Sequence, residues 1–310
     1  MSFAFVFPGQ GSQSLKMMDK FNDVGVIENL FETTKKIMDI DFLTMLQEDT
    51  PDNINKTINT QPLLLCASYA TYLTWIDKTQ KEPEIVAGHS LGEWTALVAA
   101  GVIKFEDALR LVKLRAEFMQ EAVKPSEGAM AVVLGLEDEK VIEVCEDIQK
   151  NSYGVVSGVN FNSPGQVVIA GDKKSVDLAS TKLKEQGAKR VQILPVSVPS
   201  HCMLMKPAAD KLVTEINKIE FATPRIKVLH NVNASECSNI AEIKDALIKQ
   251  LYSPVLWTKT IQDIVTRGIK HIIECGPGKV LSGLNKRISE DITCYNLHSL
   301  DDIEKVNMAL

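Results

Sequence analysis

The chain has 310 residues and a formal net charge of −6 at pH 7, with 45% apolar and 24% charged residues. This composition is typical of a soluble globular protein and argues against general binding of nucleic acid, which requires a basic surface. No stretch reaches the ~18 consecutive apolar residues of a membrane span, and the first residues lack the basic segment of a signal peptide. The six cysteines show no CxxC pair and no metal-ligand spacing. We therefore expect free thiols, no bound metal and a location in the cytoplasm.

The first part of the chain predicts strands that lead into glycine loops. The apolar run that ends at Phe7 is typical of a buried strand, and Pro8-Gly9 opens the loop after it. Residues 84–88 (EIVAG) predict a second short strand, followed by a helix over residues 91–100. Residues 105–123 predict a longer amphipathic helix.

The middle of the chain changes character. The predicted elements are a strand at 129–136, a helix at 137–150, a strand at 155–161, a turn at 162–165, a strand at 166–171, a helix at 175–187 and a strand at 188–196. This βαββαβ order is that of a ferredoxin-like unit. We therefore predict an inserted ferredoxin-like subdomain over residues 124–196.

The last part of the chain, after residue 196, again predicts strands that alternate with helices. Asn239, with Glu242 three residues on, predicts the start of a helix over residues 240–251, and residues 269–276 predict another buried strand. Residues 1–123 and 197–310 are therefore expected to form one large catalytic subdomain. We predict an α/β fold with a mainly parallel sheet that is α/β-hydrolase-like. Ligands of such sheets bind beyond the carboxyl ends of the strands.

A candidate nucleophile lies between the second strand and its helix. Residues 88–92 (GHSLG) fit the pattern G-x-S-x-G, in which a serine at a tight strand-to-helix turn exposes its hydroxyl. The helix that follows directs its free N–H groups at the same point and favours an oxyanion. The alternative is an ordinary glycine-rich turn, but the strand before it and the helix after it favour Ser90 as a nucleophile.

A serine nucleophile needs a base, and the chain has five histidines. His201 follows the inserted subdomain directly, where the chain re-enters the large part, and spacing places it ahead of each of the other four. His89 is expected to point away from the site. A base histidine also needs an acceptor for its second N–H. No acidic residue stands in an obvious position, whereas the carbonyls at the end of the helix near Gln250 lack intrahelical partners.

Arg115 lies on the apolar stripe of the helix over residues 105–123, four residues after Leu111 and four before Met119. A buried guanidinium requires an anionic partner. Two interpretations stay open from spacing: a structural pair with an internal carboxylate, or a clamp for the carboxylate of a substrate.

Together these residues resemble malonyl-CoA:acyl carrier protein transacylases of bacterial fatty acid synthesis, nearly over the whole chain. The segments that carry the resemblance are 7–13 (FPGQGSQ), 88–94 (GHSLGEW), 159–171 (VNFNSPGQVVIAG), 195–208 (PVSVPSHCMLMKPA), 250–258 (QLYSPVLWT) and 274–281 (ECGPGKVL).

The resemblance implies a role for each matching residue. Ser90 would be acylated, His201 would be its general base, and the main-chain carbonyl of Gln250 would orient His201. The other implied roles are an oxyanion hole made by the amides of Gln10 and Leu91, a carboxylate clamp at Arg115, and pocket walls at Met119 and Asn160.

The resemblance also implies substrates and partners. Malonyl-CoA would be the donor and holo acyl carrier protein the acceptor, with no cofactor and a monomeric enzyme. Because acyl carrier proteins are acidic, we expect a basic docking patch, for which Lys189-Arg190 and Lys286-Arg287 are candidates.

Two other functions compete with this one. A serine hydrolase would use the same turn but needs a triad acid after Ser90 in the chain. A nucleotide-binding module is disfavoured, because the loop at residues 9–14 lacks the third glycine of the dinucleotide fingerprint and residues 276–279 are not a P-loop.

Overall fold

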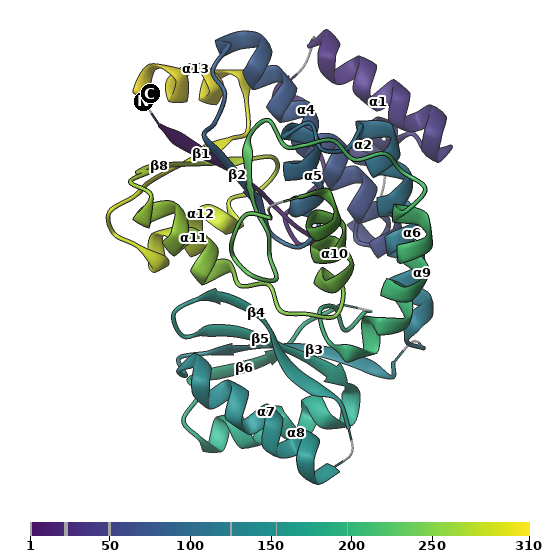
Figure 1. Ribbon diagram of the computed structural model, residues 1–310, viewed down its shortest axis with the longest axis vertical. Helices are drawn as coiled ribbons and strands as arrows, with labels where there is room; N and C mark the ends of the chain where they lie inside the picture. The colour runs from purple at the N-terminus through teal and green to yellow at the C-terminus, as the bar shows by residue number, and fades with distance from the viewer. Residues whose placement is uncertain are drawn as a thin grey trace.

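The computed structural model describes residues 2–21, 24–48, 51–124, 126–152, 154–196, 198–237 and 239–310. Figure 1 shows a large part built around one sheet and a smaller part below it built around a second sheet. The predicted border at residue 197 lies outside the described residues. No helix in the described ranges is long and apolar enough to cross a membrane.

The large sheet is parallel throughout its five strands. Its strand order is β7 (Lys227–Leu229), β2 (Ile85–Gly88), β1 (Phe3–Phe7), β8 (His271–Cys275) and β9 (Thr293–Leu297). The mainly parallel sheet predicted for this part is therefore confirmed.

Both faces of this sheet are covered, which explains why β1 is fully buried. Phe3, Phe5 and Phe7 pack on one face in the larger hydrophobic core, which includes Trp75. Ala4 and Val6 face the opposite core, which includes Trp257. Alternation along a strand sends successive side chains to opposite faces, so one apolar run supports two layers of helices.

The helices of the large part agree with the predicted ones at every position where one was predicted. They are η1 (Asp19–Phe21), α1 (Gly25–Met38), α2 (Phe42–Glu48), α3 (Pro51–Ile54), α4 (Thr57–Thr79), α5 (Gly92–Ala99), α6 (Phe105–Ala122), η2 (Met203–Met205), α9 (Lys206–Ile216), α10 (Ile240–Gln250), α11 (Trp257–Thr266), α12 (Val280–Ile288) and α13 (Leu300–Ala309). The predicted cap of α10 forms, because Asn239 Oδ1 accepts from the Glu242 amide at 3.0 Å.

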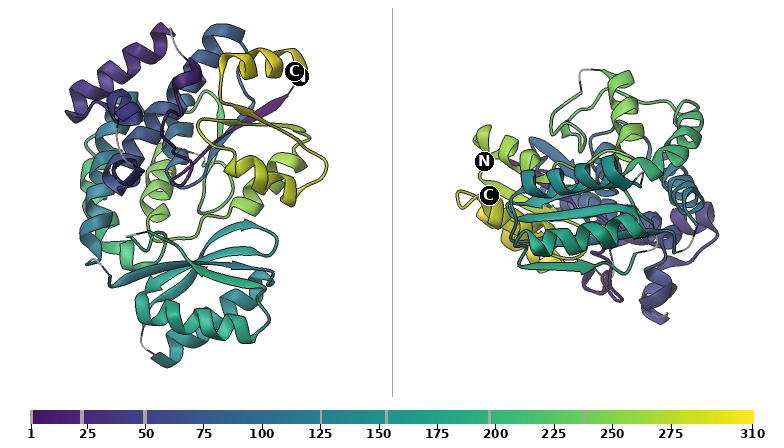
Figure 2. Two further views of the ribbon diagram at one scale, coloured as in Figure 1. Left: turned by 180° about the vertical axis from the view of Figure 1, so that it is seen from behind. Right: turned by 90° about the horizontal axis from the view of Figure 1, so that it is seen from below.

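The smaller sheet is antiparallel and has the predicted βαββαβ element order. Its strand order is β4 (Val156–Ser163), β5 (Gln166–Asp172), β3 (Gly128–Leu134) and β6 (Arg190–Ile193). Helices α7 (Asp138–Ser152) and α8 (Lys173–Glu185) cover the face turned away from the large part (Figures 1 and 2). The predicted turn at 162–165 is shorter than expected, because pairing of Ser163 with Gln166 extends the strands and leaves Pro164-Gly165 as the loop.

The register of the large sheet places the two loops of the site next to each other. Phe7 pairs with Gly88, so the loop after β1 and the turn after β2 leave the sheet at the same level. The smaller sheet closes over this edge, where the Phe161 amide donates to the Val255 carbonyl at 3.0 Å. The site therefore lies where the two parts of the chain meet.

Candidate active site

The turn between β2 and α5 holds Ser90 in a left-handed conformation with φ of 52°. A Cβ on Gly92 would lie 2.0 Å from the Phe7 carbonyl oxygen, and a Cβ on Gly88 would lie 1.9 Å from the Gly92 carbonyl carbon. Both glycines are therefore required for the close approach of strand and helix, which is the reason for the G-x-S-x-G spacing.

His201 lies against Ser90, and the end of α10 holds it there. Its Nε2 is 2.8 Å from Ser90 Oγ, and its Nδ1 donates to the Gln250 carbonyl at 2.7 Å. The His201 amide donates to the Leu251 carbonyl at 2.9 Å. Since Nδ1 carries the proton, Nε2 keeps a lone pair for the serine hydroxyl. Among the described residues, a main-chain carbonyl thus stands where a triad has its acid.

Burial lowers the pKa of His201 to about 3, and the positive charge of Arg115 acts in the same direction. His201 is 3% exposed, so water does little to stabilise its protonated form. The imidazole is therefore neutral at pH 7 and able to accept a proton.

This low pKa predicts a pH profile for the reactivity of Ser90. The rate of Ser90 labelling by a neutral fluorophosphonate is expected to stay nearly constant from pH 8 to pH 5. A histidine with an ordinary pKa near 6.5 would lose about thirtyfold over the same range. Circular dichroism at each pH controls for unfolding, and a break in the labelling rate near pH 6.5 would contradict the assignment.

Arg115 projects from α6 into the same site and is 1% exposed. It donates to Gln61 Oε1 at 2.6 Å and to Gln250 Oε1 at 3.0 Å, and its Nη2 lies 3.4 Å from Ser90 Oγ. Burial lowers the pKa of Arg115 to about 10, so it stays protonated at neutral pH. Among the described residues no ion pair to the guanidinium forms within 4.0 Å, and its Nε has no partner, although the nearby charge of Glu93 acts to raise the pKa of Arg115. A structural pair with an internal acid, one of the two interpretations left open by the sequence, is not formed.

The two residues expected at the oxyanion hole lie in the two segments next to Ser90. A Cβ on Gly9 would lie 2.4 Å from the His89 carbonyl oxygen, so the loop that carries Gln10 abuts the turn directly. Leu91 precedes the first residue of α5, where main-chain amides lack intrahelical partners. Both residues line the cavity beside Ser90.

A cavity of about 130 Å³ joins these groups. Its lining residues are Gln10, Thr57, Gln61, His89, Ser90, Leu91, Arg115, Met119, Met130, Asn160, Leu194, Val196, Val198, Ser200 and His201. Met119 and Asn160 are thus among the lining residues, and Asn160 Oδ1 is buried without a partner among the described residues. His89 is among the lining residues, while its ring contacts two residues outside the lining: Nε2 donates to Asn162 Oδ1 at 2.8 Å, and the ring packs against Trp257.

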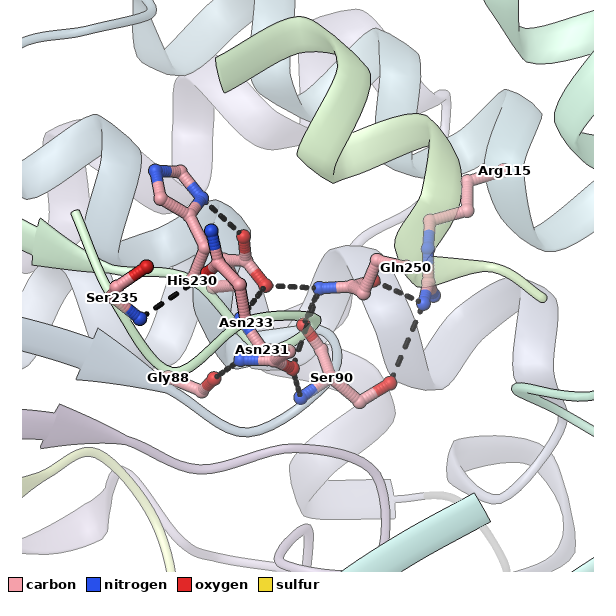
Figure 3. A network of polar contacts seen from close by, with 9 residues as sticks. Gly88, Ser90, Arg115, His230, Asn231, Asn233, Ser235 and Gln250 are labelled. Carbon is pink, nitrogen blue, oxygen red and sulfur yellow. Dashed lines mark hydrogen bonds and ion pairs between the residues drawn. The ribbon is translucent and has the colours of Figure 1, made fainter. Parts of the chain in front are cut away.

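Sequence reasoning missed the polar residues that support this site. Asn231 Oδ1 accepts from the Ser90 amide at 2.7 Å, while Asn231 Nδ2 donates to the Gly88 carbonyl at 2.6 Å. Gln250 contributes its side chain as well as its carbonyl, since Nε2 donates to the Ser90 carbonyl at 2.9 Å (Figure 3). Glu93 gave a signal in the sequence, as the one acidic residue of helix α5.

A serine on a strand-to-helix turn, with a neutral histidine in contact, defines the class of α/β enzymes that pass acyl groups through a serine ester. Comparison with known proteins narrows the class. The chain matches the acyl transferase domain over residues 4–293, and it belongs to that family.

Curated relatives in this family align over nearly the whole chain. The malonyl CoA-acyl carrier protein transacylase of Escherichia coli strain K12 is 50% identical over 297 residues, which are 96% of each chain. The transacylase of the same name from Bacillus subtilis strain 168 is 40% identical over 308 residues, 99% of this chain and 96% of the relative.

Solved structures agree with the fold. An acyl carrier protein S-malonyltransferase from Vibrio cholerae superposes with a TM-score of 0.96 at 45% identity, covering 99% of this chain and 100% of the other. A malonyl-transacylase solved in complex with its type II PKS acyl-carrier protein superposes with a TM-score of 0.97 at 44% identity, covering 100% of both chains.

Proposed function

We propose that this chain transfers the malonyl group of malonyl-CoA to the phosphopantetheine thiol of acyl carrier protein, and so supplies extender units for fatty acid synthesis. The observation that carries the proposal is the position of Ser90 Oγ, 2.8 Å from His201 Nε2 and 3.4 Å from Arg115 Nη2. A nucleophile beside a base serves any acyl transfer. A cation beside the same nucleophile, bound to two neutral carboxamides, favours an acyl group that carries its own carboxylate.

The reaction follows a ping-pong course. Ser90 Oγ attacks the thioester carbonyl as His201 Nε2 takes the hydroxyl proton, and the amides of Gln10 and Leu91 stabilise the oxyanion. The tetrahedral intermediate collapses to malonyl-Ser90, and the departing coenzyme A thiolate takes the proton from His201. The thiol of acyl carrier protein then gives its proton to His201 and attacks the ester. Ser90 regains the proton as malonyl-acyl carrier protein leaves.

The pocket walls set the orientation of the acyl group. Arg115 would bind the free carboxylate, and Met119 and Asn160 line the same cavity. The cavity of about 130 Å³ suits a short acyl group, which agrees with a three-carbon unit. No cofactor or metal enters any step.

The basic docking patch is supported by the register of the smaller sheet. Leu134 pairs with Arg190 on one side and with Gln166 on the other, and Arg287 Nη2 donates to Gln166 Oε1 at 2.8 Å. The two basic pairs, Lys189-Arg190 and Lys286-Arg287, thus lie at the same end of this sheet and are exposed. We propose that this end receives the acidic carrier protein.

The proposal includes the domain organisation, the oligomeric state and the location of the enzyme. We also propose that the chain is divided into two subdomains: residues 1–123 and 197–310 form the large catalytic subdomain, and residues 124–196 form the inserted one. The protein would act as a monomer in the cytoplasm, where both substrates are made.

Intact-protein mass spectrometry after brief mixing with malonyl-CoA tests the proposal. We expect one malonyl adduct, mapped to Ser90 by peptide digestion, that moves to holo acyl carrier protein when it is added. Free malonate without transfer would instead identify a hydrolase. If malonyl-CoA remained unreacted, its assignment as the acyl donor would be wrong. The same experiment would then be repeated with other acyl-CoA thioesters.

A further inference from the structure

A second layer of polar side chains lies behind Ser90. It consists of Glu93 on α5 and of His230, at the end of β7, with the adjacent Asn231. Glu93 and Asn231 are 0% exposed and His230 is 1% exposed. Neither Glu93 nor His230 lines the cavity beside Ser90. Figure 3 shows the network that runs from His230 past Asn231 and Gln250 to Arg115.

The Glu93 carboxylate accepts three hydrogen bonds. Its Oε1 accepts from His230 Nδ1 at 2.7 Å, and its Oε2 accepts from the Asn231 amide at 3.1 Å and from Gln250 Nε2 at 2.7 Å. A carboxylate can only accept, so the amino group of Gln250 must face Glu93. The Gln250 oxygen is thereby left to face Arg115, at 3.0 Å.

The protonation state of His230 determines whether the negative charge of Glu93 balances the positive charge of Arg115. One carboxamide group separates the Glu93 carboxylate from the Arg115 guanidinium. With a neutral His230, Glu93 would balance the charge of Arg115 across that group. With a protonated His230, Glu93 and His230 form a neutral pair, and His230 offsets the attraction by which Glu93 raises the pKa of Arg115.

The surroundings favour the protonated form. Burial by itself lowers the pKa of His230, but hydrogen bonds to Cys237 and Glu93 outweigh burial and raise the pKa to about 10. The Glu93–His230 distance of 2.7 Å is that of a charge-assisted hydrogen bond.

We propose that Glu93 and His230 form a buried ion pair that orients the Gln250 carboxamide and leaves the charge of Arg115 unbalanced, so that the site prefers acyl groups bearing a free carboxylate. Both are positioning residues, since they act on the acyl group through Gln250 and Arg115. The inference rests on the proposed malonyl transfer and adds to it the source of acyl selectivity.

His230→Asn separates charge from hydrogen bonding. The asparagine amino group can replace Nδ1 as the donor to Glu93, but it carries no charge. We expect the ratio of the Ser90 acylation rate constants for malonyl-CoA and acetyl-CoA to fall by roughly 10- to 100-fold, because Glu93 would then balance Arg115. The matched control is His271→Asn, a half-buried histidine at the start of β8 that contacts Tyr295 at 3.2 Å. It should leave the ratio unchanged.

The double variant Glu93→Gln/His230→Asn removes both charges and makes the pair neutral again. We expect it to recover most of the lost ratio, although it differs from wild type at two buried positions. A purely structural role predicts the opposite, since a second buried substitution would add damage. A ratio in His230→Asn within threefold of wild type, or a lower ratio in the double variant than in the single one, would overturn the proposal.

A measurement on the unmodified protein completes the test. In ¹⁵N NMR spectra at pH 8, both ring nitrogens of His230 should give the shifts of a protonated imidazole. A neutral ring would overturn the ion pair even if no variant folds. Wild-type mass spectrometry separates the two claims: absence of malonyl-Ser90 sinks the proposed function, while malonyl-Ser90 with a neutral His230 sinks only this inference.

Discussion

Replacing Ser90 with alanine is expected to abolish the acyl adduct and to lower malonyl transfer by about 10⁴- to 10⁶-fold. Ser90 Oγ is the atom on which His201 Nε2 and Arg115 Nη2 converge, so its removal would leave the proposed base and the proposed carboxylate clamp without a nucleophile. Alanine keeps the Cβ and faces the same positive φ, so the turn itself should persist. Transfer would be measured with radiolabelled malonyl-CoA and holo acyl carrier protein.

The variant His201→Ala tests whether His201 acts together with Ser90. It should lower transfer to a similar extent, and the Ser90→Ala/His201→Ala double variant should be no worse than Ser90→Ala alone, because the two residues act as a unit. Multiplicative losses in the double variant would mean that His201 acts independently of Ser90. Melting temperatures of all three variants show whether the fold is retained.

Replacing Arg115 with alanine is expected to lower acylation by malonyl-CoA by roughly 10²- to 10³-fold, because removing one partner of a buried charge pair leaves the other unpaired. Acylation by acetyl-CoA, which has no free carboxylate, should fall far less or rise. The guanidinium has Gln61 and Gln250 as neutral partners at 2.6 and 3.0 Å. Its charge is therefore available to a substrate. Second-order rate constants of Ser90 acylation by both thioesters measure the effect.

Arg110→Ala is the matched control for Arg115→Ala. Arg110 lies on the same helix α6, but it is exposed and forms an ion pair with Asp107 at 3.3 Å. It should leave both rate constants within about threefold of wild type. Equal losses on malonyl-CoA and acetyl-CoA in Arg115→Ala would assign Arg115 a structural role instead.

The sequence by itself determined the features that depend on short stretches of chain. The glycines around Ser90, the cap at Asn239 and the βαββαβ order are local signals, and each agrees with the structure. The end of α10 at Gln250 also predicted a free carbonyl, and His201 Nδ1 donates to it. These predictions succeeded because turns and helix ends are set by residues a few positions apart.

Only the tertiary structure decided which distant residues meet. Gln61 contacts Arg115 from 54 positions away, and Asn231 contacts Ser90 from 141 positions away. Neither stands in a motif, because a buried polar residue is satisfied by whatever partner the packing brings near it. The partners of Arg115 are of this kind, since its guanidinium donates to Gln61 and Gln250, which are distant in the chain. The turn that carries Ser90 was therefore predictable from the sequence, while the contacts around Ser90 depended on the folded chain.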